Sequence, residues 1–283
     1  MRLIRLANWL KLSICLLAAV HCSGSIAADA ASGAGLPEDS SEAGAEATPP
    51  DPIRIALETG REALRTKDYA KAYGLLHSAA EQGNAKAQSA LGGMYLAGQG
   101  VAANDTEAIK WYQRAAEQED PDAQVSLGLM YANGRGVAKD DEAAVRWFRL
   151  AASTDNPAAQ NYLGVMYLDG RGVEKNVAAA ANWLQMAARQ GGSEAQVNLG
   201  VLFLQGQGVE QDDPEAAQWF LRAAEQGNAL AQYYIGVCFA KGRGVPRDSE
   251  EAAKWLTKAA MQGLTQAKDY LLANGNMSVN SGK

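Results

Sequence analysis

Residues 159–191, AQNYLGVMYLDGRGVEKNVAAAANWLQMAARQG, carry the pattern that decides the fold. The same positions recur every 36 residues through five copies, without insertion or deletion. The pair Ala159-Gln160, for example, has equivalents at Ala87-Gln88, Ala123-Gln124, Ala195-Gln196 and Ala231-Gln232. A fixed period of this length is typical of solenoid proteins, in which each repeat packs only on its neighbours.

Each copy predicts two helices joined by a glycine turn. In the first helix, Ala87, Leu91 and Tyr95 follow a 3.6-residue period, and in the second Ala108 and Trp111 do so. The intervening Gly-x-Gly-Val is expected to end the first helix with a left-handed glycine. The second glycine is expected to keep the turn flexible, so that the valine folds back onto the core.

The start of every second helix has an Asn or Asp that can act as an N-cap. These residues are Asn104, Asp140, Asn176, Asp212 and Asp248. Three copies add a glutamate three residues later (Glu107, Glu215 and Glu251), which predicts capping boxes. The first helices of the second and third copies open with Asp120-Pro121 and Asn156-Pro157, a cap followed by a first-turn proline.

Small residues recur where helices are expected to cross. Gly164 and its equivalents lie in the middle of the first helices, where glycine costs about 1 kcal/mol relative to alanine. We therefore expect a neighbouring helix to approach too closely for a methyl group. Trp183 and its equivalents are predicted to fill the core beside these crossings. A single 36-residue unit buries too little apolar surface to fold alone, so the copies must stack.

The first residues of the chain have the pattern of a secretory signal. Basic residues precede an apolar run from Leu12 to Val20, and Ser25-Ile26-Ala27 has the small-residue spacing of a cleavage site. The run is shorter than the roughly 20 apolar residues of a membrane-spanning helix. We therefore expect a cleaved signal peptide over residues 1–27 and a periplasmic location, with secretion as the alternative.

Composition divides the remaining chain. Residues 28–51 contain six acidic residues and no basic one, which predicts a disordered acidic linker, and residues 274–283 predict a disordered tail. The repeat domain is expected at residues 52–273. It comprises a divergent helical pair (53–83), five repeats (84–119, 120–155, 156–191, 192–227 and 228–263) and a closing helix (264–273).

Charge and residue usage exclude several functions. Loss of the signal changes the formal net charge from −6 to −9, because it removes three bases and no acid, and this argues against nucleic-acid binding. It leaves Cys238 as the single cysteine and His77 as the single histidine, so we expect no internal disulfide, metal or cofactor. We interpret Cys238 as a buried apolar residue and His77 as a solvated surface residue.

The repeat resembles the Sel1-like repeat family, a branch of the helical repeats related to tetratricopeptide repeats. Its motif reads A-x-x-x-L-G-x-M-Y-x-x-G-x-G-V and then A-x-x-W-x-x-x-A-A-x-x-G, closely over residues 84–263 and loosely over 53–273. Glu119 and Asp155 stand where other copies have glycine, and we expect a changed local angle there. The resemblance implies an all-α fold, a right-handed α/α solenoid of stacked helical hairpins, and a protein-binding scaffold rather than an enzyme.

By analogy with related superhelices, the first helices are expected to line a concave surface. Residues on the exposed side of these helices are the candidate partner-binding site: Asn133, Asn161, Tyr162, Asp169, Asn198, Gln205, Tyr233 and Tyr234. Amides can bind an extended peptide backbone, and tyrosines supply rigid contact area. An alternative interpretation is that some of these tyrosines pack between helices.

Two hypotheses of function follow. The first is an exported monomeric scaffold that binds another protein of the cell envelope, in assembly or signalling, with no membrane insertion after signal removal. The second is a cell-wall enzyme that hydrolyses β-lactams or peptidoglycan. A cysteine-rich subset of the resembling family is associated with β-lactams, but this chain lacks its cysteine pairs. Binding of an envelope polysaccharide is a third possibility, because aromatic residues serve it equally well.

Overall fold

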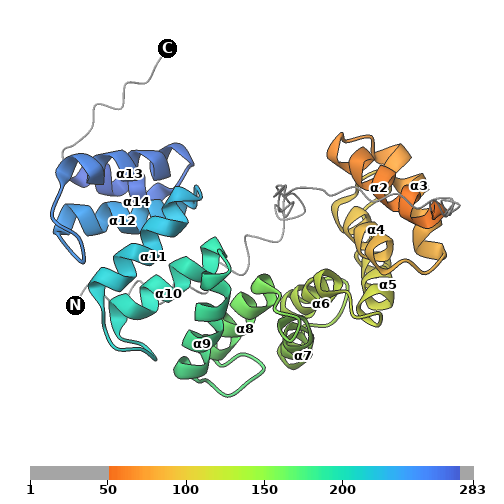
Figure 1. Cartoon of the computed structure of the whole chain (residues 1–283), viewed down its shortest axis with the longest axis horizontal. Coiled ribbons are helices and arrows are strands. Elements are labelled where there is room, and N and C mark those ends of the chain that lie inside the picture. Colours follow the sequence, from red (N-terminus) through yellow and green to blue (C-terminus); the bar gives the residue numbers. More distant parts are fainter. Residues whose placement is uncertain (1–50, 275–283) are drawn as a thin grey trace, which may run out of the picture. The chain divides into compact units, whose positions relative to one another are not determined.

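Every regular element in the described part of the chain, residues 51–274 of the computed structural model, is an α-helix (Figure 1). The thirteen helices of these residues are α2 (Pro52–Arg65), α3 (Tyr69–Glu81), α4 (Ala85–Ala97), α5 (Asp105–Ala116), α6 (Pro121–Asn133), α7 (Asp141–Ala152), α8 (Pro157–Asp169), α9 (Val177–Arg189), α10 (Ser193–Gln205), α11 (Asp213–Glu225), α12 (Ala229–Lys241), α13 (Ser249–Met261) and α14 (Thr265–Ala273). The expected all-α fold of helical pairs is confirmed. The predicted signal peptide and all but the last residue of the acidic linker lie outside the described residues, as does the tail beyond Asn274.

The described chain divides into two compact units. Unit 1 comprises residues 51–123 and 133–138, and unit 2 comprises residues 124–132 and 139–274. Within unit 1, helices α2 to α5 each pack against the next helix in the chain, and within unit 2 helices α7 to α14 do the same. The first helical pair, α2 and α3, shares this packing although its turn, Thr66 to Asp68, is shorter than the turn between α4 and α5.

Side-chain caps start the second helices as expected, but the predicted capping boxes do not form. Asn104 Oδ1 accepts hydrogen bonds from the N–H groups of Thr106 and Glu107. The N–H of Asn104 itself donates to the carbonyl of Tyr95, on the first helix of the pair, instead of to the Glu107 carboxylate. Glu107 is therefore left to pair with Lys110. The tertiary bond competes successfully because the Gly-x-Gly turn brings the two backbones together.

The glycines in the middle of the first helices permit a close crossing, as predicted. A Cβ placed on Gly92 would lie 2.9 Å from the ring of Tyr112, and one on Gly236 would lie 2.8 Å from Leu256. Gly60 has the same relation to Leu76, at 2.8 Å, so the divergent first pair crosses in the same way. The group that fills the space is the residue after the tryptophan position, not the tryptophan itself.

The second glycine of the Gly-x-Gly turn lies against the preceding helical pair, a role that was not predicted. Gly98 and Gly100 both have left-handed backbone conformations, with φ of 66° and 73°. A Cβ on Gly100 would lie 2.5 Å from the carbonyl oxygen of Tyr69, which begins the second helix of the preceding pair. This glycine is therefore needed for close contact between successive repeats, and the expected flexibility of the turn does not account for it.

Three arginines join successive repeats beside this contact. Within unit 1, Arg135 Nε donates to the Asp105 carboxylate at 2.9 Å, and its Nη2 donates to the Leu96 carbonyl at 2.7 Å. Within unit 2, Arg171 does the same with Asp141 and Ala132, and Arg243 with Asp213 and Leu204. At the two remaining junctions of this type in the described residues, the positions are held by Gln99 with Tyr69 and by Gln207 with Val177, so the arginine and its aspartate are replaced together.

Candidate binding surfaces

An amide pair links the first helices α8 and α10 of unit 2. Asn198 Nδ2 donates to Asn161 Oδ1 at 3.0 Å, and Asn161 Nδ2 donates to the Glu194 carboxylate at 3.4 Å. Asn161 is buried, with 7% of its surface exposed, whereas Asn198 and Glu194 are half-buried. Asn161 therefore positions the other two side chains at the surface instead of meeting a partner itself.

Two of the three predicted tyrosines pack between helices, as the alternative interpretation held. The Tyr162 ring stacks on Phe148 of α7, with centroids 5.2 Å apart, and the Tyr234 ring stacks on Phe220 of α11 at 4.8 Å. Burial raises the pKa of Tyr162 to about 12, with Glu194 adding to the shift. Both hydroxyl groups are consequently protonated at neutral pH.

Tyr233 belongs to a separate aromatic group at the C-terminal end of unit 2. Its ring lies 5.6 Å from that of Tyr234 and meets Tyr270 of α14 edge-on at 6.4 Å. Burial raises the pKa of Tyr233, and Tyr270 raises it further. Tyr270 was not among the predicted residues, although it stands 36 residues after Tyr234 and the repeat register extended into the closing helix indicates it.

The other predicted residues do not belong to this group. Asp169 and Gln205 are the last residues of α8 and α10, about two helical turns beyond Asn161 and Asn198, or roughly 10–12 Å along each helix. Asn133 is exposed at the end of α6 and belongs to unit 1. The structure thus gives two groups of residues within unit 2, one around Asn161 and one around Tyr233, and we call the two together the Asn–Tyr surface. It comprises Asn161, Tyr162, Glu194, Asn198, Tyr233, Tyr234 and Tyr270.

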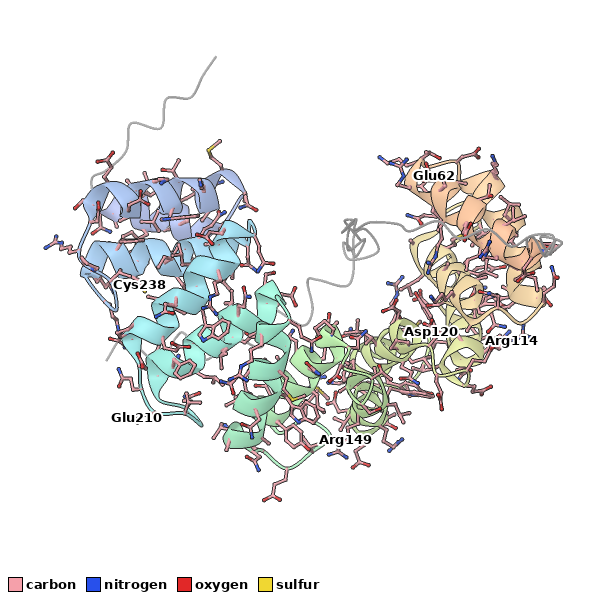
Figure 2. The ribbon with its side chains drawn as sticks, in the orientation of Figure 1. Glu62, Arg114, Asp120, Arg149, Glu210 and Cys238 are labelled. Atoms are coloured by element: carbon pink, nitrogen blue, oxygen red, sulfur yellow. The ribbon has the colours of Figure 1, made fainter. Side chains whose placement is uncertain are left out.

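The cysteine and the histidine of the described residues, Cys238 and His77, both lie in packed positions. Cys238, labelled in Figure 2, is 4% exposed in the core of unit 2, and burial raises the pKa of its thiol to about 11, as expected of an apolar role. The prediction that His77 is solvated is wrong. Its ring is half-buried, 5.3 Å from Tyr73 and 5.9 Å from Trp111, because the tryptophan of the next repeat covers this position.

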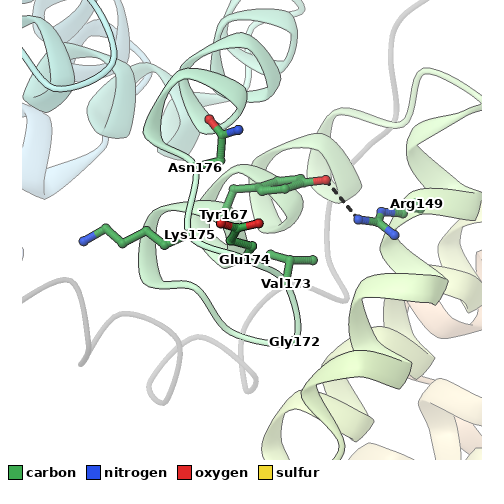
Figure 3. A pocket seen from close by; sticks show the side chains of 7 residues that line it. All are labelled: Arg149, Tyr167, Gly172, Val173, Glu174, Lys175 and Asn176. Atoms are coloured by element: carbon green, nitrogen blue, oxygen red, sulfur yellow. Dashed lines mark hydrogen bonds between the residues drawn. The ribbon is translucent and has the colours of Figure 1, made fainter.

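A polar pocket of about 420 Å³ lies beside the turn between α8 and α9 (Figure 3). Arg149 reaches it from α7 and donates a hydrogen bond from Nη2 to the Tyr167 hydroxyl at 2.9 Å. Val173, Lys175 and Asn176 line the remainder, together with Glu174 and Gly172. No sequence motif indicates this pocket, since its residues come from two different repeats.

Within residues 51–274, no three side chains of His, Cys, Asp or Glu gather as they would around a metal ion. The helices of the same part of the chain all fall short of the length and apolar character that crossing a membrane requires.

A stack of helical hairpins with glycine crossings and polar and aromatic surfaces defines a protein of the tetratricopeptide-like helical repeat class. The family model described as Sel1 repeat matches six consecutive segments: residues 53–84, 85–120, 121–156, 157–192, 193–228 and 229–264. The chain belongs to the Sel1 repeat family, whose repeats form a protein–protein interaction scaffold. The pair expected as divergent is therefore a sixth repeat.

Solved structures agree with this assignment. The Sel1 repeat protein from Oxalobacter formigenes is 35% identical, with a TM-score of 0.69, over 75% of this chain and 84% of that one. A protective antigen present in uropathogenic Escherichia coli strains, displaying an SLR fold, is 33% identical with a TM-score of 0.70. The match covers 81% of this chain but half of the antigen. An immunity protein from Pseudomonas aeruginosa, 24% identical with a TM-score of 0.54 over 77% and 83% of the chains, shares the fold. Comparison with curated proteins gave no match.

Proposed function

We propose that this protein is an exported scaffold that binds another protein of the cell envelope through the Asn–Tyr surface. The observation that carries the proposal is the Asn161–Asn198–Glu194 hydrogen-bonded group, in which the buried Asn161 of α8 holds two polar side chains of the neighbouring first helix α10 in place. An extended segment of a partner offers backbone N–H and C=O groups that amides and carboxylates can bind. Tyr233 and Tyr270 add aromatic contact area at the C-terminal end of unit 2.

The chemistry of the acidic residues supports binding rather than catalysis. Glycan hydrolysis by carboxylates needs two facing acids at a suitable separation. The carboxylates of Asp105, Asp141 and Asp213 instead pair with arginines of the next repeat, and Asp140 and Asp212 cap helices. These carboxylates therefore stabilise the structure of the repeat.

Export is proposed from the sequence of residues 1–27. A basic start, a short apolar run and the Ser-Ile-Ala site together have the arrangement of a cleaved signal. The test is N-terminal sequencing of the protein recovered from the periplasm of the expressing bacterium. We expect the mature chain to begin after Ala27 or within a few residues of it, and recovery of the intact leader in the cytoplasm would contradict export.

Partner binding is tested by crosslinking in the envelope and co-purification with two variants of the Asn–Tyr surface. Asn198→Ala and Tyr233→Ala remove half-buried groups without emptying the core, so both should fold and both should reduce partner recovery at least fivefold. Gln218→Ala, an exposed change on the second helix α11, is the matched control. Equal recovery with all three variants would remove the Asn–Tyr surface from the proposal.

A further inference from the structure

The polar pocket beside the turn between α8 and α9 is lined by two opposite charges that do not pair. Arg149 reaches the pocket from α7, and Glu174 lies in the turn that precedes α9. Within residues 51–274, neither side chain forms an ion pair, with the other or with a third residue. Both charges are therefore available to a ligand in the pocket.

The guanidinium group of Arg149 is held in position by a tyrosine of the next repeat. Its Nη2 donates to the Tyr167 hydroxyl at 2.9 Å, and its central carbon lies 6.0 Å from the centre of the Tyr167 ring (Figure 3). An arginine has five N–H donors, and this bond to a neutral hydroxyl uses one of them. The remaining donors suit a carboxylate, whose two oxygens match the guanidinium group.

Glu174 decides which ligands the pocket accepts. The other cation of the lining, Lys175, extends away from Arg149 (Figure 3) and forms no ion pair with Glu174 in the described part of the chain. A ligand with only a carboxylate would be repelled by Glu174, and a ligand with only a cationic group would be repelled by Arg149. A ligand that carries both charges is attracted by both residues.

This pair of opposite charges is found at one junction of the array. The equivalent positions hold His77 with Ala102, Gln113 with Ala138, Gln185 with Glu210, and Leu221 with Pro246. The turns at these junctions share the Gly-x-Gly-Val sequence, so the backbone does not require Arg149 and Glu174. The two charges are thus a property of this pocket and not of the repeat.

The pocket has the size of a small-molecule site. Its volume of about 420 Å³ lies in the range of roughly 300–1,000 Å³ that is typical of ligand pockets. Val173 and the half-buried Tyr167 ring supply apolar contact area between the charged groups. A molecule the size of an amino acid or a short peptide can be accommodated there.

We propose that this pocket binds a small zwitterion, an amino acid or a short peptide with a free ammonium group and a free carboxylate. Arg149 binds the carboxylate, Glu174 binds the ammonium group, and the Tyr167 hydroxyl positions Arg149. Both ends of such a ligand are charged at neutral pH. The site shares no residue with the Asn–Tyr surface and does not depend on the proposed protein partner.

The test is isothermal titration calorimetry of the purified protein with L-alanine and with L-alanyl-L-alanine. The tighter of the two probes identifies the source as a free amino acid or a peptide. Its N-acetyl form, which lacks the ammonium group, and its C-terminal amide, which lacks the carboxylate, should each bind at least tenfold more weakly. Binding of neither probe overturns the proposal. Equal binding of either blocked form assigns the site to a single charge and also overturns it.

Two variants test the assigned roles. Glu174→Gln and Arg149→Gln should each bind the tighter probe at least fivefold more weakly than wild type. Arg149→Gln should fold normally, because Gln113 and Gln185 hold this position in other copies. Glu174→Gln should also bind the N-acetyl form more tightly than wild type does, because the repulsion of the carboxylate is removed.

Glu210→Gln is the matched control, since Glu210 is exposed at the equivalent position of the next repeat. It should bind every probe as wild type does. Unchanged binding of the tighter probe by Glu174→Gln or by Arg149→Gln overturns the proposal. An equal loss in Glu210→Gln would place the ligand elsewhere and likewise overturn it.

Discussion

At the residue scale, some glycines of the repeat are needed for their left-handed backbone conformation and not because a neighbouring group approaches them closely. Gly191 ends the third repeat with φ of 91°, and a Cβ there would meet nothing within 4 Å. Glu119 and Asp155 hold equivalent positions and keep left-handed conformations, with φ of 63° and 59°. The backbone conformation is therefore imposed by the junction, and the two non-glycine residues bear a conformational cost of about 1–2 kcal/mol each.

We expect two glycine-to-alanine changes to have opposite effects on stability. Gly191→Ala should lower the free energy of unfolding by about 1–2 kcal/mol, because alanine strains a left-handed position. Gly74→Ala, in the exposed middle of α3 and also without neighbours within 4 Å, should raise it by about 0.5–1 kcal/mol. Urea unfolding followed by circular dichroism measures both. Changes of the same sign in the two variants would contradict a backbone origin.

At the scale of elements, the junctions between repeats are alike in geometry but differ in their side-chain links. Arg135, Arg171 and Arg243 each join the start of a preceding second helix to the end of a preceding first helix. Arg243 lowers the pKa of Asp213 by hydrogen bonding, so the link contributes stability above the ordinary carboxyl range. That contribution is lost as the pH falls through the lowered pKa.

An arginine–aspartate pair can be introduced at the junction where Gln207 and Val177 hold these positions. The double variant Val177→Asp with Gln207→Arg should show a coupling free energy of about 0.5–1 kcal/mol in a double-mutant cycle, typical of a partly exposed pair. Urea unfolding of the four proteins at pH 7 measures it. The coupling should disappear below about pH 3, where the aspartate is protonated. Purely additive single variants at pH 7 would show that the arginine links contribute nothing.

At the scale of the whole molecule, stability is a sum of local contacts between neighbouring helices. The closing helix α14 covers the last repeat with Ala267 and Leu271, which pack on Leu256 and Ala259 of α13. Each repeat contacts only its neighbours, so the loss of a contact at one end should be felt at that end. The stability of the helices in unit 1 should not change when a contact of α14 is lost.

Leu271→Ala tests this locality. The side chain is 2% exposed, so its truncation should cost about 2–4 kcal/mol in local contacts and unfold α14. Hydrogen exchange measured by mass spectrometry should accelerate at least tenfold in α13 and α14, while α2 to α5 keep their wild-type rates. Leu272→Ala, the adjacent and 67% exposed residue, should leave exchange unchanged everywhere. Acceleration throughout the chain would show global cooperativity instead.

The sequence by itself determined the helical pairs, the N-caps such as Asn104 and the close crossing at Gly92, because these depend on contacts within a repeat. It also contained the residues of the Asn–Tyr surface, but not their roles. That Tyr162 and Tyr234 stack on the preceding helix, and that Asn161 is buried beneath Asn198, depends on how one repeat sits on the next. Only the tertiary structure decided those contacts, since a side chain of given type and spacing can pack against a neighbour or face water with equal local propensity.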